Sequence, residues 1–195
     1  LSRSAWIDSL GIAVKCATVF PENPKKGLAM INGAVSLFSD IDGKLEALID
    51  FHLVTKWKTA GDSLLAASRL ARKDSQNILI VGAGTVARSL RDAYGALFPE
   101  AKFTVWNRSA KNAEKMASEF SGMKVAYNLK EAVTKSDIVT CATMAKDPIL
   151  KGEWLRPGQH IDLIGAYRPD MREVDDNAIL RARVFVDSYA TTVSH

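Results

Sequence analysis

The feature of this sequence that most restricts its fold is a glycine turn between an apolar strand and a helix. Residues 77–81 form a continuous apolar run, typical of a strand that is buried on both faces. Gly82-Ala83-Gly84 ends this run, and apolar residues at spacings of three or four then predict a helix over residues 85–97. A strand, a tight turn and a helix in direct succession indicate the start of a βαβ unit and therefore a parallel sheet.

The rest of residues 76–195 repeats this alternation of strands and helices. The patterns predict strands over residues 102–106, 124–127, 137–141, 160–164 and 184–187, and helices over residues 111–120, 129–134 and 178–181. Ser109 stands where the first of these helices needs an N-cap. Alternation over about 110 residues predicts a Rossmann-like, doubly wound α/β domain with a parallel sheet.

Residues 1–75 show a different pattern. Strands are expected over residues 12–20, 34–38 and 45–49, and the Asp-rich turn at residues 40–43 predicts an antiparallel hairpin between the last two. A long helix is expected over residues 55–73. These elements make only a thin layer, so we expect part of a smaller α+β domain, which missing termini or a partner chain would complete.

Composition excludes several classes of protein. Of the 195 residues, 47 % are hydrophobic and 25 % are charged, which is ordinary for a globular chain and argues against disorder. Residues 1–75 hold 10 basic and 8 acidic residues and residues 76–195 hold 16 and 14, so each part contributes +2 to the net charge of +4. No basic block therefore indicates a nucleic-acid surface, and no apolar run is long enough for a membrane helix.

The cysteines and histidines indicate no metal site. Cys16 and Cys141 lie far apart in apolar runs, which predicts two buried thiols in a reducing, cytoplasmic compartment. His52, His160 and His195 lack metal-ligand spacing and are expected to be structural or exposed. The chain starts at Leu1 without a methionine and stops just after a strand-like run, so we expect a fragment.

The glycine turn has the spacing of a dinucleotide-binding site. Gly82 permits the tight turn, Gly84 lets a pyrophosphate come close to the backbone, and the small Ala87 lets the helix pack near the sheet. The free N–H groups around Thr85 and Val86 then face the phosphates. The alternative is a structural glycine turn in a domain that binds nothing.

The end of the next strand indicates which dinucleotide binds. In NAD-selective domains a carboxylate at this position accepts hydrogen bonds from the ribose 2′-hydroxyl. Here the strand runs into Asn107-Arg108-Ser109, with Lys111 close by. Arg108 can pair with a 2′-phosphate, to which Asn107 and Ser109 can hydrogen-bond, so NADP(H) is favoured over NAD(H). The alternative is that Arg108 is an ordinary solvated loop arginine.

The nicotinamide is expected at the carboxyl edge of the sheet, where such sheets bind ligands. The apolar loop Ala142-Thr143-Met144 follows the predicted strand 137–141, and Gly165 follows strand 160–164 at the same edge. These four residues are therefore predicted to line the nicotinamide side of the cofactor.

Several collinear stretches resemble the ornithine cyclodeaminase and mu-crystallin family. They are Val14-Lys15, Phe20-Pro21-x-Asn23, Lys58-Thr59-Ala60, the glycine turn, Val105-Trp106-Asn107-Arg108, Gly152-x-Trp154-x-x-Pro157-Gly158 and residues 165–173. The resemblance implies a nicotinamide cofactor, a substrate with an α-carboxylate, a homodimer, and relatives that are longer at both ends. The family includes cyclodeaminases, alanine dehydrogenases and ketimine reductases.

The resemblance also implies roles for two lysines. Lys15 matches a lysine that contacts the substrate, where an ammonium can hold a carboxylate or polarise an imine. Lys58 and Thr59 match a motif that usually begins with Arg and that holds the substrate carboxylate or a cofactor phosphate; Lys keeps the charge without the bidentate fork. The alternatives are a surface role for Lys15 and an intrahelical pair between Lys58 and Asp62.

One departure from the family bears on the reaction. Ornithine cyclodeaminases carry a catalytic Asp at the position that appears here as Tyr167, and Tyr is no carboxylate base near neutral pH. Asp170 is three residues away, but the resemblance gives it no such role. We therefore expect hydride transfer from NADPH to the C=N carbon of an α-imino acid, or the reverse. The alternatives are ornithine cyclodeamination with bound NAD, and a non-enzymatic, NADPH-dependent binder of a small ligand.

Overall fold

A computed structural model of the chain describes residues 2–166 and 168–189. The chain divides into two compact units between Lys58 and Thr59, rather than at the predicted boundary between residues 75 and 76. The division falls inside helix α1 (Phe51–Leu70) because Ala60 and Ala67, in the later part of that helix, are buried in the core of the second unit.

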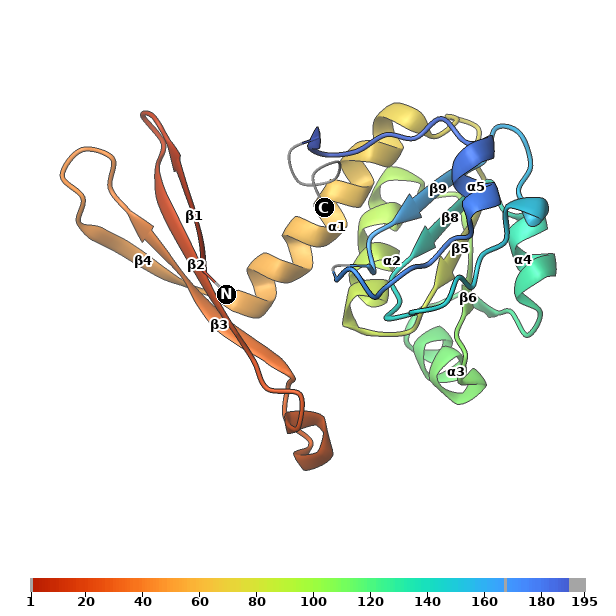
Figure 1. Ribbon diagram of the computed structural model, residues 1–195, viewed down its shortest axis with the longest axis horizontal. Helices are drawn as coiled ribbons and strands as arrows, with labels where there is room; N and C mark the ends of the chain where they lie inside the picture. The colour runs from red at the N-terminus through yellow and green to blue at the C-terminus, as the bar shows by residue number, and fades with distance from the viewer. Residues whose placement is uncertain (1, 167, 190–195) are drawn as a thin grey trace. The chain divides into compact units, whose positions relative to one another are not determined.

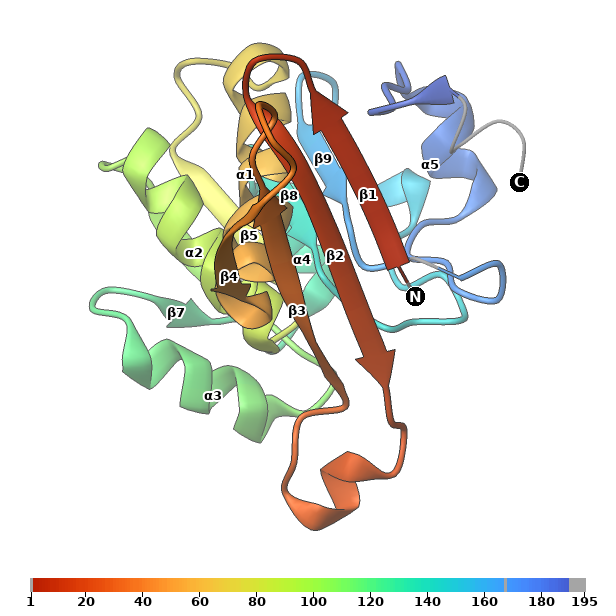
Figure 2. The same ribbon diagram turned by 90° about the vertical axis from the view of Figure 1, so that its left-hand side faces the viewer.

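The first unit is an antiparallel sheet of four strands in the order β1-β2-β3-β4 (Figure 2). Its strands are β1 (Ser2–Ile7), β2 (Gly11–Val19), β3 (Ile31–Phe38) and β4 (Leu45–Asp50), with a 3₁₀ helix η1 (Asn23–Lys26) between β2 and β3. The predicted hairpin is confirmed, because β3 and β4 pair antiparallel around the turn at residues 39–44. Strand β1 was not predicted. All six of its residues are exposed, and its sequence shows no alternation of apolar and polar residues that would indicate a buried side.

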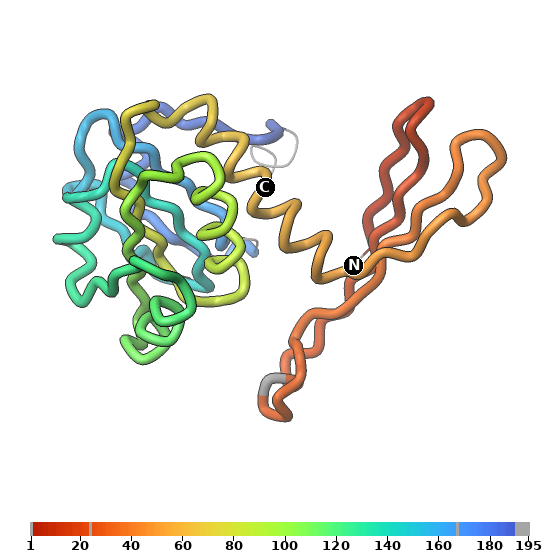
Figure 3. Tube along the Cα trace, turned by 180° about the vertical axis from the view of Figure 1, so that it is seen from behind, coloured from red at the N-terminus to blue at the C-terminus, as the bar shows by residue number. Residues whose placement is uncertain are grey.

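The two hairpin turns of the sheet lie at the same end, opposite the segment that joins β2 to β3 (Figures 1 and 3). Asp40 connects these turns, since its carboxylate accepts hydrogen bonds from the Trp6 indole N–H and, at 2.7 Å, from the backbone N–H of Ser9. The apolar core of this unit is thin. Among its described residues, only three apolar side chains are buried, namely Ala17, Val35 and Phe51.

The second unit contains a parallel sheet in the order β7-β6-β5-β8-β9. This is the doubly wound order that was predicted, since the chain starts in the middle and adds strands to both sides. Its elements are β5 (Asn77–Val81), α2 (Thr85–Leu97), β6 (Lys102–Trp106), α3 (Ala110–Glu119), β7 (Lys124–Val125), α4 (Leu129–Lys135), β8 (Ile138–Cys141), η2 (Gly152–Trp154), β9 (His160–Leu163) and α5 (Asp176–Arg181).

Helices cover both faces of this sheet, as Figure 1 shows for α2 on one side and α4 and α5 on the other. The central strand β5 explains why. Ile78 and Ile80 pack into the core that α2 and α3 cover, whereas Leu79 and Val81 pack into the core that α4 and α5 cover. Because successive side chains of a strand point to opposite faces, the continuous apolar run supplies both cores.

Three expectations need correction. Residues 184–187 form no strand; they pair with nothing in the described chain, and Val184 and Phe185 are 58 % and 56 % exposed, so β9 remains the edge of the sheet. Cys16 is exposed, because it lies on a strand of the thin first unit, and only Cys141 is buried. Helix α1 starts at Phe51, four residues earlier than expected, because the Asp50 carboxylate accepts a hydrogen bond from Leu53 N at 2.8 Å and caps the helix.

Helix α1 has 20 residues, but no helix in the described part of the chain is both long and apolar enough to cross a membrane.

Polar side chains are buried where α2 meets β8 and β9. The Asp162 carboxylate accepts hydrogen bonds from the Tyr94 hydroxyl at 3.2 Å and from the Thr140 hydroxyl at 2.6 Å. Burial, followed by the charge of Asp162, raises the pKa of Tyr94 well above its ordinary value, so Tyr94 stays a hydrogen-bond donor. His160 lies close by, and its buried Nε2 has no hydrogen-bond partner in the described residues.

We expect His160 to make the stability of the protein depend on pH. Burial lowers the pKa of His160, and the charge of Asp162 opposes this only in part. Neutral His160 therefore makes its full contribution to the free energy of unfolding above about pH 6.5. This contribution is lost as the pH falls toward and through the lower pKa of the folded state. His160→Gln should lose less unfolding free energy than the wild type between about pH 7 and about pH 5, measured by urea unfolding. The exposed His52→Gln is the control, and parallel pH profiles of wild type and His160→Gln would refute the expectation.

Candidate cofactor-binding site

A cavity of about 330 Å³ opens at the carboxyl ends of β5, β6 and β8 in the second unit. The switch point of a doubly wound sheet, where the chain leaves the central strand in two directions, lies at this edge. Eight of the residues predicted to bind the cofactor line the cavity together: Gly82, Gly84, Asn107, Arg108, Ser109, Ala142, Thr143 and Met144. Sequence reasoning did not identify Ala83, Trp106, Asn112, Ala145 and Ile149, which complete the wall.

Gly82 brings the end of β5 close to the loop after β8. Its φ of 115° lies in the region that favours glycine, and a Cβ there would lie 2.6 Å from the Ala142 carbonyl oxygen. Its N–H donates to the Trp106 carbonyl at 2.8 Å, which joins the turn to β6. No larger residue satisfies these conditions without moving Ala142.

The start of α2 fits the pyrophosphate of a dinucleotide. A Cβ at Gly84 would meet no atom within 4 Å, and Gly84 gives the helix no side-chain cap. The first N–H groups of α2 are therefore available to an anion in front of the turn. Ala87 is fully buried and Val86 partly buried, so both face the core, as the spacing predicted for Ala87.

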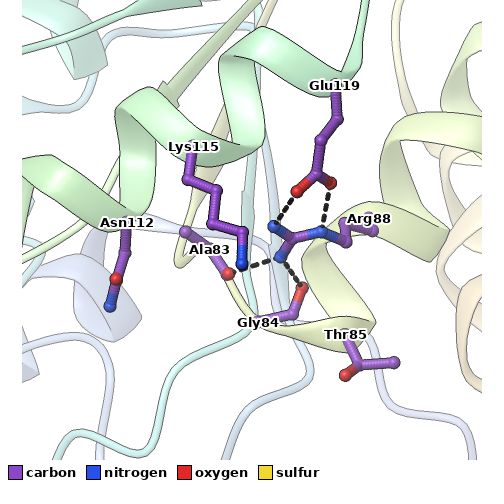
Figure 4. A pocket seen from close by; sticks show the side chains of 7 residues that line it. All are labelled: Ala83, Gly84, Thr85, Arg88, Asn112, Lys115 and Glu119. Carbon is purple, nitrogen blue, oxygen red and sulfur yellow. Dashed lines mark hydrogen bonds and ion pairs between the residues drawn. The ribbon is translucent and has the colours of Figure 1, made fainter.

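Thr85 lies in a second cavity of about 410 Å³ that adjoins the first and is shared with α3 (Figure 4). Here Arg88 hydrogen-bonds to the backbone of the glycine turn: its Nη1 donates to the carbonyls of Ala83 and Gly84 at 2.7 and 3.2 Å. Glu119, at the end of α3, accepts two hydrogen bonds from the same guanidinium at 2.5 and 2.8 Å. This hydrogen bond raises the pKa of Arg88 and lowers that of Glu119.

The sequence did not point to this pair, because Arg88 and Glu119 are 31 residues apart. Each of them alone resembles an ordinary surface charge on a helix. The only local signal is that Arg88 lies one turn inside the helix that follows the glycines, where its side chain can reach back to the turn.

The residues after β6 lie at the rim of the cavity. Arg108 is exposed, and its guanidinium has no ion-pair or hydrogen-bond partner among the residues that the structure describes. Ser109 occupies the N-cap position of α3, as predicted, but its hydroxyl makes no capping hydrogen bond. Asn107 donates from Nδ2 to the Ser109 carbonyl at 3.0 Å and so shapes the turn. Lys111 lines neither cavity, whereas Asn112 lines both.

Besides Val86 and Ala87, which face the core, two further predicted cofactor residues line neither cavity. Gly165 follows β9 and lies against the backbone of Thr143. A Cβ at Gly165 would lie 2.2 Å from the Thr143 carbonyl oxygen. Thr59 lies in α1. Contact of either residue with a cofactor stays a prediction.

Lys15 and Lys58 belong to the first unit, and the structure brings their charges close together. The Lys15 ammonium, on β2, donates to the Thr55 hydroxyl at 2.9 Å and lies 4.6 Å from the centre of the Phe51 ring. Burial, then the charges of Lys58 and Arg3, lower the pKa of Lys15. Such a concentration of positive charge suits a bound carboxylate. Arg3 and Thr55 were missed, because one lies on the unpredicted β1 and the other has no motif.

The position that would carry the catalytic Asp of a cyclodeaminase, Tyr167, lies outside the described residues. Asp170 forms ion pairs with Lys146 at 3.0 Å and with Arg168 at 2.9 Å. The hydrogen bond from Lys146 is the largest of the effects that lower the pKa of Asp170, so this carboxylate is a poor proton acceptor.

We expect Arg88→Gln to weaken NADPH binding about tenfold, because the turn loses charge-assisted hydrogen bonds while the helix itself remains. Fluorescence titration of NADPH measures the effect, and Glu119→Gln should show a smaller change in the same direction. The matched control is Lys135→Gln, which breaks the exposed Lys135–Glu131 pair on α4 and should leave the NADPH affinity unchanged. Wild-type affinity in Arg88→Gln would rule out a role for this pair in holding the turn.

Comparison with known proteins agrees with this geometry. The chain is 48 % identical over 200 residues to a Delta(1)-pyrroline-2-carboxylate reductase of Paracoccus denitrificans, covering 100 % of the chain and 63 % of the relative. It is 36 % identical to the ketimine reductase mu-crystallin of Rattus norvegicus, covering 91 % of the chain and 57 % of the relative. The chain thus spans about three fifths of the length of these relatives.

Solved structures show the same fold. The Delta(1)-pyrroline-2-carboxylate reductase of Thermococcus litoralis, in complex with NADH and L-proline, superposes with a TM-score of 0.88 at 31 % identity, covering 99 % of this chain and 66 % of that one. An archaeal alanine dehydrogenase dimer with bound NAD gives a TM-score of 0.86 at 26 % identity, covering 98 % and 64 %. The family model for the ornithine cyclodeaminase/mu-crystallin family matches residues 7–195. The chain belongs to the ornithine cyclodeaminase/mu-crystallin family.

Proposed function

We propose that the protein is an NADPH-dependent reductase of cyclic or open α-imino acids. The observation that carries this proposal is the cavity itself: an uncapped helix start, a glycine turn and a free arginine surround a space that suits a nicotinamide dinucleotide. The names of the relatives support the substrate class, since two of them are called reductases of Delta(1)-pyrroline-2-carboxylate and another a ketimine reductase.

The reaction adds two electrons and two protons to a C=N bond. When bound, NADPH would supply the hydride for the imine carbon; a proton from solvent or a protein group would complete the nitrogen, and the products would be an α-amino acid and NADP⁺. The protein must hold the cofactor and orient the imine. Lys15 and Lys58 carry the charge that would bind the α-carboxylate, and their mutual repulsion falls when an anion binds.

The preference for NADP(H) rests on Arg108 and Ser109. A guanidinium without a partner in the described chain and an uncommitted hydroxyl suit a 2′-phosphate, and no carboxylate follows β6 to accept hydrogen bonds from a 2′-hydroxyl. NAD(H) is the alternative, because the Thermococcus litoralis and archaeal structures hold NADH and NAD.

Homodimer formation and a cytoplasmic location complete the proposal. Large apolar side chains of the first unit are exposed, among them Trp6, Ile7 and Leu48, and one structural relative is described as a dimer. The free thiols of Cys16 and Cys141 suit a reducing compartment.

The central test is an assay of the full-length protein with NADPH and Δ1-pyrroline-2-carboxylate or Δ1-piperideine-2-carboxylate. Absorbance at 340 nm should fall, and Lys15→Met should lower kcat/KM about 100-fold because it removes the carboxylate's charge partner. The control is Lys44→Met, an exposed lysine in the turn between β3 and β4. No NADPH consumption with any α-imino acid refutes the proposal; ammonia release from ornithine would indicate a cyclodeaminase, and NADPH binding without turnover a binder.

The coenzyme preference has its own test. Arg108→Gln should raise the KM for NADPH about 10- to 100-fold and leave the KM for NADH nearly unchanged, because only NADPH carries the 2′-phosphate. Lys111→Gln, which removes a neighbouring charge that does not line the cavity, is the control. Tighter binding of NADH than of NADPH by the wild type would overturn the preference.

A further inference from the structure

A buried carboxylate joins the two loops that follow β8 and β9. Glu173 is only 2 % exposed. Its Oε1 accepts hydrogen bonds from the backbone N–H of Thr143 at 2.8 Å and from the Thr143 hydroxyl at 2.7 Å. Its Oε2 accepts a hydrogen bond from the backbone N–H of Gly165 at 3.0 Å. One side chain thus satisfies donors from both loops at the carboxyl edge of the sheet.

The backbone of Glu173 is held as firmly as its side chain. Its carbonyl accepts hydrogen bonds from the N–H groups of Ile149 and Leu150 at 3.1 and 3.0 Å. On either side of it, Arg172 N donates to the Ala145 carbonyl at 2.8 Å, and Val174 forms a β-bridge with Leu150. The carboxylate therefore reaches Thr143 from a fixed position.

The site requires a carboxylate rather than another polar group. Three donors converge on its two oxygens, and no lysine, arginine or histidine of the described chain forms an ion pair with it. A glutamine of the same size has one acceptor oxygen, and its NH₂ group would face a donor N–H. Gly165 makes the approach possible, because a Cβ there would lie 2.4 Å from Glu173 Oε1.

The contacts also determine what Thr143 does in the cavity. Its hydroxyl donates to Glu173 and accepts a hydrogen bond from Ala145 N at 3.3 Å, so its rotamer is locked. Met144, 58 % exposed in the wall of the cavity, lies between these two anchored residues. The shape of this wall thus depends on a residue that does not itself line the cavity.

We propose that Glu173 is a positioning residue, which fixes Thr143 and Met144 so that the nicotinamide of the cofactor is held in the orientation for hydride transfer. This inference rests on the proposed function. The glycine turn and Arg108 bind the other end of the dinucleotide and do not contact Glu173. Loss of the carboxylate should therefore disturb the orientation of the nicotinamide more than the affinity for the whole cofactor.

The experiment compares Glu173→Gln and Thr143→Val with wild type in the full-length protein. Thr143→Val keeps the branched shape and removes one of the three hydrogen bonds, so it covers the case in which Glu173→Gln folds poorly. The matched control is Glu131→Gln, which makes the same substitution at an exposed glutamate on α4. The measurements are amide hydrogen exchange of residues 142–145 and 164–166, the Kd of NADPH, kcat with Δ1-pyrroline-2-carboxylate, and thermal unfolding.

In Glu173→Gln we expect exchange at Thr143 and Gly165 to rise at least tenfold while that of β5 and α2 stays unchanged. The value of kcat should fall about 10- to 100-fold, and the Kd of NADPH should rise less than threefold. Thr143→Val should show the same split with smaller changes, and Glu131→Gln should behave as wild type.

Wild-type exchange in both loops of Glu173→Gln would overturn the inference. So would a lower melting temperature with kcat and Kd both unchanged, since that is the result of a purely structural role. If the wild type binds NADPH but reduces no imine, the proposed reductase function fails. In that case two measurements still decide whether Glu173 orders these loops. They are the amide hydrogen exchange of the loops and the fluorescence of bound NADPH, which reports how firmly the nicotinamide is held in wild type and in Glu173→Gln.

Discussion

The close approach of β5 to the loop after β8 is the constraint on which the candidate site depends. The strand can end against the Ala142 carbonyl only because Gly82 has no side chain and takes a positive φ. This approach places the start of α2, the rim at Arg108 and the loop at Thr143 around one cavity. A larger residue at position 82 would separate these walls, and none of the other binding groups would then converge.

Around this turn, charged side chains act mainly on the protein's own backbone. Arg88 donates to the carbonyls of the glycine turn, and Glu173 accepts from the N–H groups of the two loops on the opposite side. Charged groups are expensive to bury unless they form hydrogen bonds, and here the buried Glu173 accepts three and the partly buried Arg88 donates four. The charges that remain uncommitted, above all Arg108, are then the ones available to a ligand.

The two units differ in how they are stabilised. The second unit buries apolar side chains on both faces of its sheet, so its loops and helix ends are attached to a rigid support. The first unit buries very few apolar side chains in its described part, and its sheet is held chiefly by backbone pairing. The cationic group around Lys15 nevertheless has fixed partners there, since Phe51 and Thr55 present a ring and a hydroxyl from the first turns of α1.

The sequence by itself determined the elements whose pattern is local. Strand β5, helix α2 and strand β6 have the predicted bounds, because a continuous apolar run, a glycine turn and a helical period are each readable within about a dozen residues. Local patterns at the glycine turn, after β6 and after β8 also identified eight of the residues that line the cavity. Only the tertiary structure decided that residues 184–187 pair with no strand in the described part of the chain, that β1 forms although its side chains are exposed, and that Cys16 faces solvent.

It also decided the roles of Glu173 and of the Arg88–Glu119 pair. Glu173 meets Thr143 across 30 positions of the chain, and Arg88 meets Glu119 across 31. The distance in space between such groups depends on the packing of whole strands and helices rather than on any local pattern.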